Sequence, residues 1–204
     1  SVLANLLAGH APGMSRSIDW IPDRAVWTGA VTVTLPAVSP LLSAFDCRNN
    51  QLLLATLAQI DNDITEAIAH YGHERIGVVI GTSTSGIEQA ESAYRARDAA
   101  GHLPQSFSYP TTLNNFSAPA LVAHAVGAAG PTFAISTACS SSAKVFAAAA
   151  RLMRANWIDA AIVGGVDSLC LTTLCGFSAL ELLSPLPCRP FDRARSGISI
   201  GEGA

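Results

Sequence analysis

The chain has 204 residues, of which 50% are hydrophobic and only 13% are charged, and its 12 basic and 15 acidic side chains nearly balance. This composition excludes an intrinsically disordered chain, which combines low hydrophobicity with high net charge. The charge balance excludes the basic surface that nucleic acid or an anionic membrane would require. The length predicts one domain or two small ones, and a chain this apolar must cover surface in a large core or in a large subunit contact.

In chain order, short β-branched runs alternate with amphipathic stretches. The runs that predict strands are residues 31–35, 76–80, 131–136, 160–163 and 198–200. The stretches that predict helices are residues 51–71, 88–99 and 117–125, an alanine-rich segment ending near residue 155, and residues 177–183. Asn49 or Asn50 and Ser117 are expected to cap helices, and Gly72 is expected to end one. This alternation predicts an α/β fold with a mostly parallel sheet covered on both faces.

The five cysteines follow no regular spacing and form no CxxC pair. They therefore predict neither a zinc site nor a disulfide framework, and we expect a cytoplasmic protein with reduced thiols and no metal or cofactor. No apolar stretch reaches the roughly 20 residues of a membrane-spanning helix, so we expect no membrane association.

Cys139 lies at the most informative position, between a predicted strand and the alanine-rich helix. Its neighbours, Ala138 and Ser140 to Ser142, are small, as a tight turn requires. At a helix N-terminus the partial positive charge favours a thiolate, and unpaired main-chain N–H groups can stabilise an oxyanion. Free cysteines are more often buried structural residues, but these small neighbours favour a nucleophile.

Five segments then carry a resemblance to a known family. They are Gly127–Pro131, Ile135–Ser142, Val163–Asp167, Gly176–Ser184 and Pro190–Ala204. In this order they resemble segments of the β-ketoacyl–acyl carrier protein synthases, the condensing enzymes of fatty acid and polyketide synthesis, although Ala128 and Ala129 depart from the family pattern. The segments around Asn49-Asn50 and Gly81–Gly86 also resemble the condensing enzymes of aryl polyene synthesis.

The resemblance implies a thiolase-like α/β fold with layers in the order α-β-α-β-α and a mixed, mostly parallel sheet. It implies that residues 1–204 are an N-terminal β-ketoacyl synthase domain without the family's first strand and C-terminal half. The family's two decarboxylating histidines are expected in that second half, because none of the chain's histidines falls in a matching segment. We expect His70 and His73 at the surface and His124 in the core. The chain alone is expected not to catalyse condensation.

Carried over by residue, the resemblance implies that Cys139 is the catalytic nucleophile and that its own N–H is one oxyanion donor. Phe177 would be a gating aromatic beside the acyl pocket. Thr84 would limit acyl chain depth across a dimer, and its small, polar side chain argues against an ordinary saturated fatty-acyl substrate. Phe107 and Tyr109 either line the same pocket or anchor their loop.

The implied reaction transfers an acyl group to the cysteine and then condenses it with malonyl carrier protein, with loss of carbon dioxide. The implied partners are acyl carrier protein and a second subunit, in a homodimer or in a heterodimer with a related subunit.

Other functions stay open at this stage. A thiolase of the same fold would act on coenzyme A thioesters, and a non-catalytic subunit of a heterodimer would shape the acyl pocket but lack the cysteine. A cysteine hydrolase would place glycine where Thr137 stands. A phosphate-binding loop at Gly81–Gly86 is the weakest alternative because it lacks the lysine of that motif; the only lysine of the chain is Lys144.

Overall fold

The computed structural model describes residues 2–21 and 23–204, which divide into two compact units. The first unit contains the residues before Thr34 together with Leu169–Gly203, and the second contains Thr34–Ser168 together with Ala204. Each unit has a three-stranded sheet of its own.

The second unit is built on a parallel sheet with the strand order β4-β3-β5. Its strands are β3 (Ile76–Gly81), β4 (Thr132–Ile135) and β5 (Ala160–Gly165). Its helices are α2 (Arg48–Leu57), α3 (Asp61–Tyr71), α4 (Ile87–Arg95), α5 (Ser117–Val126) and α6 (Ser141–Arg154). The central strand β3 is buried along its whole length. This burial is expected, because the strand has a neighbouring strand on each side and helices on both faces.

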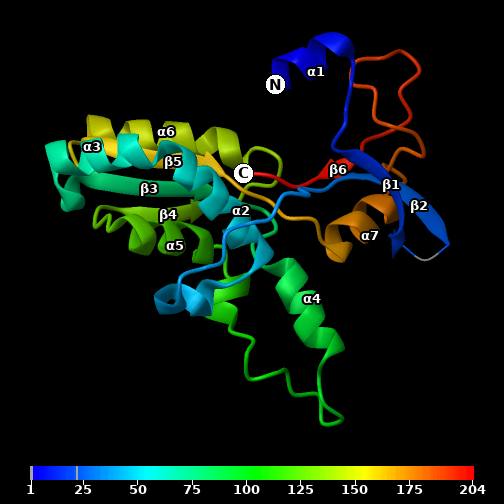
Figure 1. Cartoon of the computed structure of the whole chain (residues 1–204), viewed down its shortest axis with the longest axis horizontal. Helices are drawn as coiled ribbons and strands as arrows, with labels where there is room; N and C mark the ends of the chain where they lie inside the picture. Colours follow the sequence, from blue (N-terminus) through cyan, green and yellow to red (C-terminus); the bar gives the residue numbers. More distant parts are fainter. Residues whose placement is uncertain (1, 22) are drawn as a thin grey trace. The chain divides into compact units, whose positions relative to one another are not determined.

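Helices α6 and α5 lie on opposite faces of this sheet (Figure 1). On the α6 face, Val79 of β3 packs against Val145 and Ala149 in a buried cluster. The outer side of α6 leaves Phe146 and Met153 exposed. Some of the chain's many apolar side chains therefore lie outside its core.

The described part of the first unit contains an antiparallel pair of strands and two helices. Its elements are α1 (Val2–Ala8), β1 (Met14–Ile21), β2 (Arg24–Gly29), α7 (Leu171–Ala179) and β6 (Ile200–Gly201). The strands β1 and β2 are antiparallel, and β6 pairs with β2 in parallel. The core of this unit is a buried cluster of Val26, Leu174 and Leu183.

The central elements confirm the sequence predictions. The structure has the predicted strands at 76–80, 131–136 and 160–163, the predicted helix at 117–125 and the alanine-rich helix ending at Arg154. Gly72 ends α3 with a φ of 84°, a conformation that glycine adopts at little cost. These elements have strong hydrophobic periodicity and buried partners, which is why the local pattern identifies them.

The predicted strand at 31–35 is wrong, and the hairpin β1–β2 before it was not predicted. Residues 31–35 contain no regular secondary structure. The N–H of Val31 donates to the Glu202 carboxylate at 2.8 Å, a side-chain bond that takes the place of a strand partner there. A β-branched run becomes a strand only where a neighbouring strand is available, and the sequence does not show that neighbour.

The predicted helix at 51–71 is two helices, separated by a 3-10 turn at Ala58–Ile60. Helix α2 packs against α5, whereas α3 packs against the sheet. The apolar spacing continues across the break because the turn is only three residues long. Asn49 and Asn50 do not cap the helix; Cys47 is the N-cap, and both asparagines are buried in the first turn.

Smaller differences concern element ends. Helix α4 ends at Arg95 rather than Ala99, and α7 spans 171–179 rather than 177–183. The strand expected at 198–200 is β6, of two residues. Ser117 is the first residue of α5 rather than its cap, because its hydroxyl bonds the Thr111 carbonyl and accepts from the Asn50 amide. A π-helical turn spans Tyr109–Leu113.

Candidate active site

The three parallel strands of the second unit end at one edge of the sheet. Gly81, the last residue of β3, pairs with Ile135 of β4 and with Gly165 of β5. The turns that follow these strands, at 82–86, 136–140 and 166–168, therefore meet at this edge. In parallel α/β sheets this is the edge at which functional residues gather.

Cys139 lies in the turn between β4 and α6, with its side chain exposed. Ala138 before it has a φ of 53°, in the left-handed region that costs an L-residue roughly 1–2 kcal/mol. Ser140 is the N-cap of α6. The sharp strand-to-helix turn is thus present, and within the described residues the N–H of Cys139 donates to no acceptor.

The carbonyl group of Ala138 is held by three hydrogen bonds. Ser141 donates its hydroxyl at 2.7 Å and its N–H at 3.0 Å, and Ser83 donates its hydroxyl at 3.1 Å. The Ser141 hydroxyl in turn accepts the N–H of Thr137 at 2.9 Å. Residues from two different strand ends therefore fix the peptide group that precedes the cysteine.

Two glycines allow α6 to approach the strand ends. A Cβ on Gly81 would lie 2.7 Å from the carbonyl carbon of Ser141, and a Cβ on Gly165 would overlap the side chain of Ser142. Gly164, the other member of the glycine pair, has nothing within 4 Å of such a Cβ. Only one glycine of the pair is therefore needed for space.

Asp167 organises the turn after β3. Its Oδ1 accepts the N–H of Ser83 at 2.7 Å, the N–H of Thr84 at 2.8 Å and the Thr84 hydroxyl at 3.0 Å. The Thr82 hydroxyl lies 3.3 Å from the same oxygen. Hydrogen bonds to an ionised acceptor are stronger than those between neutral groups, so this carboxylate gives the turn a defined conformation.

Thr84 is buried, and its hydroxyl is used inside the protein. It donates to Asp167 and accepts the N–H of Ser168 at 3.0 Å. Its expected role at the end of an acyl pocket stays a prediction. An acyl chain could contact only the methyl group of Thr84, because the hydroxyl already forms hydrogen bonds inside the protein.

Phe177 lies in α7 of the first unit and packs against the cluster of Val26, Leu174 and Leu183. Its gating role stays a prediction. Phe107 is half-buried, and Tyr109 is exposed in the π-helical turn. The roles of Phe107 and Tyr109 stay predictions.

The histidines fall as expected with one exception. His70 and His73 are exposed, as predicted, whereas His124 is exposed and not part of the core. The Nδ1 of His124 lies 2.6 Å from the carbonyl of Ala120, and its ring packs against Phe45 at a centroid distance of 5.7 Å. The prediction for His124 was wrong because α5 has apolar residues on all sides, whereas its last turn extends past the core.

Sequence reasoning missed Ser83 and Asp167 as members of this site. The available signal was their position, directly after buried strands at the same sheet edge. Asp167 belongs to the segment Val163–Asp167 that carried the resemblance, but no role was assigned to it there.

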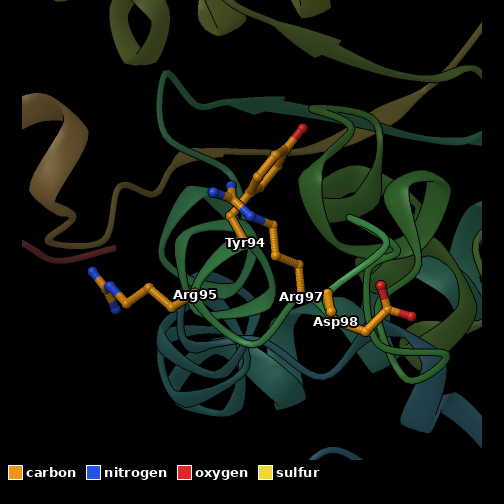
Figure 2. Close-up of a pocket in the computed structure, with 5 residues that line it drawn as sticks. Tyr94, Arg95, Arg97 and Asp98 are labelled. Carbon is orange, nitrogen blue, oxygen red and sulfur yellow. The ribbon is translucent and has the colours of Figure 1, made fainter.

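A pocket elsewhere in the described chain contains charged side chains. A surface pocket of about 440 Å³ is lined by Tyr94, Arg95, Arg97, Asp98 and Ala99. In Figure 2, Arg95 points away from Arg97 and Asp98, so the charged groups do not converge on a ligand. Among residues 2–21 and 23–204, no group of His, Cys, Asp and Glu could hold a metal ion. Every described helix is too short or too polar to cross a membrane.

Comparison with known proteins agrees with the site. Residues 49–204 match the family model described as "Beta-ketoacyl synthase, N-terminal domain". The chain is 36% identical over 138 residues to chloroplastic 3-oxoacyl-(acyl-carrier-protein) synthase I of Hordeum vulgare, covering 64% of this chain and 30% of the relative. It is 33% identical over 149 residues to 3-oxoacyl-(acyl-carrier-protein) synthase 2 of Staphylococcus aureus, covering 70% of this chain and 36% of the relative.

Among solved structures, one similar chain comes from the complex of the ketosynthase ApeO with its chain length factor ApeC, from Xenorhabdus doucetiae. The TM-score is 0.87 and the identity 39%, covering 98% of this chain and 50% of that one. This agreement confirms the expected thiolase-like α/β fold. The chain spans half or less of the length of these relatives. The barley enzyme is chloroplastic, so a cytoplasmic location stays an expectation.

Proposed function

The chain belongs to the β-ketoacyl synthase family, and on this premise we propose that it carries the nucleophile of an enzyme that condenses acyl and malonyl groups held on acyl carrier protein. The observation that carries the proposal is the exposed Cys139 in the tight turn before α6, with its own N–H unpaired among the residues that the structure describes. A cysteine that served only the core would be buried, as Cys47 and Cys170 are.

The first half-reaction uses groups of this turn. The Cys139 thiolate forms a bond from Sγ to the carbonyl carbon of the acyl thioester. The bond from that carbon to the phosphopantetheine sulfur then breaks, and the departing thiolate takes a proton from solvent. The N–H of Cys139 is a donor to the oxyanion that forms on the carbonyl oxygen.

In the second half-reaction, the malonyl thioester loses carbon dioxide, and the electron pair of the broken bond forms a carbanion. The carbanion attacks the acyl carbon on Cys139, and the cysteine leaves as a thiolate. Splitting one difficult step into two in this way is the advantage of covalent catalysis. We propose that the residues assisting decarboxylation lie outside this chain, because its histidines are placed elsewhere.

We propose acyl carrier protein as the donor and a related subunit as the partner. The names of the barley and Staphylococcus enzymes support the carrier protein. Similarity to a chain from a ketosynthase–chain length factor complex supports a heterodimer over a homodimer. In such a heterodimer, the exposed Cys139 supports assigning this chain to the catalytic subunit rather than to the non-catalytic one.

Intact mass spectrometry of the full-length protein tests the proposal. We expect incubation with an acyl carrier protein thioester to add one acyl mass, and Cys139→Ala to abolish the addition. Cys175→Ala is the matched control, because Cys175 is the other exposed free cysteine; this variant should acylate like the wild type. Acylation that persists in Cys139→Ala would overturn the proposal. Equal or faster acylation from coenzyme A thioesters of the same acyl group would favour a thiolase instead.

A further inference from the structure

We propose that Ser83, held in place by Asp167, is a positioning residue for the peptide group between Ala138 and Cys139. This inference rests on the proposed function, because the N–H of that peptide group is the proposed oxyanion donor. The geometry that leads to it is a chain of hydrogen bonds across three strand ends.

The first link joins β5 to the turn after β3. The Oδ1 of Asp167 accepts the N–H groups of Ser83 and Thr84, at 2.7 and 2.8 Å. Thr84 adds its hydroxyl at 3.0 Å. With both neighbouring N–H groups bound to one carboxylate oxygen, the main chain of Ser83 has little freedom to rotate. The direction of the Ser83 side chain is therefore set by Asp167.

The second link joins this turn to the cysteine turn, residues 136–140 between β4 and α6. The Ser83 hydroxyl donates to the carbonyl oxygen of Ala138 at 3.1 Å. That oxygen also accepts the hydroxyl and N–H of Ser141. Both Ser141 bonds come from the first residue of α6, directly after the cysteine turn. The bond from Ser83 is the one that ties the turn to a neighbouring strand end.

The third link is the peptide plane. In a trans peptide, the carbonyl of Ala138 and the N–H of Cys139 point in opposite directions within one rigid plane. Three donors that fix the carbonyl therefore also fix the direction of the Cys139 N–H. Hydrogen bonds to the carbonyl further polarise the peptide, which strengthens its N–H as a donor. A preorganised donor is worth most in catalysis, because it needs no reorientation when the oxyanion forms.

The left-handed conformation of Ala138 makes this support necessary. Its φ of 53° is unfavourable for an L-residue, so the peptide after it tends to relax. Without the Ser83 bond, we expect this peptide to sample other orientations. The thiol would stay exposed and reactive, but its N–H would be aimed at the oxyanion for less of the time.

Two reactions of the full-length enzyme separate this role from a merely structural one. Acyl transfer from carrier protein develops an oxyanion, whereas alkylation of Cys139 by iodoacetamide is a displacement that develops none. We expect Ser83→Ala to slow single-turnover acylation about 10-fold or more, since loss of a whole oxyanion donor costs about 100-fold or more. Alkylation at the same pH should stay within about 2-fold of the wild type, because the exposed side chain of Cys139 stays accessible to the reagent.

Further variants complete the test. Ser83→Thr keeps the hydroxyl and should restore most of the acylation rate. Asp167→Asn, which keeps the size of the side chain but removes its charge, should give an intermediate loss. Ser142→Ala is the matched control, because Ser142 is an exposed serine of the same helix turn whose hydroxyl makes no hydrogen bond within the described residues. It should acylate like the wild type.

The outcomes are distinct. If wild type acylates on Cys139 and Ser83→Ala acylates equally fast, the positioning role is overturned while the proposed function stands. If Ser83→Ala slows alkylation as much as acylation, Ser83 supports the turn in general and the inference is also overturned. If the wild type itself does not acylate on Cys139, the proposed function has failed. Thermal unfolding of each variant confirms that it is folded.

Discussion

Gly81 at the end of β3 lies directly against Ser141 in the first turn of α6, so close that a Cβ on Gly81 would stand 2.7 Å from the Ser141 carbonyl carbon. Side chains rarely tolerate such a contact, and the obstacle is main chain, which cannot rotate away. The position of the cysteine turn over the sheet therefore depends on the absence of a side chain on a neighbouring strand.

Gly81→Ala is accordingly expected to destabilise the protein by about 1–3 kcal/mol, the cost of overpacking a close contact. It should also lower acylation of Cys139, because α6 must shift. Gly164→Ala is the control at the same sheet edge, with nothing within 4 Å of its added Cβ; its effect should stay within about 0.5 kcal/mol. Urea unfolding measures both changes. Equal effects of the two substitutions would contradict the close-contact explanation.

Ala138→Gly should stabilise the protein by roughly 0.5–1 kcal/mol, because glycine adopts a positive φ without the penalty of a Cβ. The same substitution inside a helix serves as the control and should change the stability in the opposite direction. Ala143 is exposed in the first turn of α6, so Ala143→Gly should cost up to about 1 kcal/mol. Denaturant unfolding of both variants provides the measurement. A loss of stability in Ala138→Gly would show that the left-handed conformation is not strained.

Thr84→Val should destabilise the protein by about 1–3 kcal/mol, because it leaves the buried N–H of Ser168 without its acceptor. Thr84→Ser keeps the hydroxyl and should be close to wild type in stability. If the Thr84 methyl also closes the acyl pocket, Thr84→Ser should accept longer acyl chains. Unfolding curves and acylation by a series of chain lengths test the two roles separately. Wild-type stability in Thr84→Val would contradict the hydrogen-bonding role.

Burial raises the pKa of the Cys47 thiol from 9.0 to about 11. The unfolded chain therefore loses this proton near pH 9, while the folded protein keeps it to about pH 11. Since the unfolded state binds fewer protons in this window, stability falls as pH rises, by up to about 1.4 kcal/mol per pH unit. In Cys47→Ala, this contribution to the fall of unfolding free energy with pH should be absent.

Unfolding free energies of the wild type and Cys47→Ala at about pH 8, 9 and 10 measure the difference. Cys175→Ala, which removes an exposed thiol instead of a buried one, is the control for replacing a cysteine. A constant gap between wild type and Cys47→Ala across the three pH values would show that the thiol of Cys47 is not desolvated as the structure indicates.

The elements around the site were predictable because their signals are local. The buried run of β3, the strand β4 and the alanine-rich helix α6 each have strong periodicity, and the small residues around Cys139 predict the turn between them. The first 35 residues show the limit of such signals. The run at 31–35 has the composition of a strand, but Glu202, far away in the sequence, occupies the N–H of Val31.

The position of Cys139 between a strand and a helix follows from local sequence, because strand and helix propensities act over a few neighbouring residues. The side chains that support that turn could be identified only once the strands were assembled into a sheet. Asp167, Ser83 and Ala138 are far apart in the chain and meet because β3, β4 and β5 end at one sheet edge in register. A hydrogen bond requires its donor–acceptor distance to be correct to within a few tenths of an ångström. That distance is set by packing of the whole sheet rather than by local sequence.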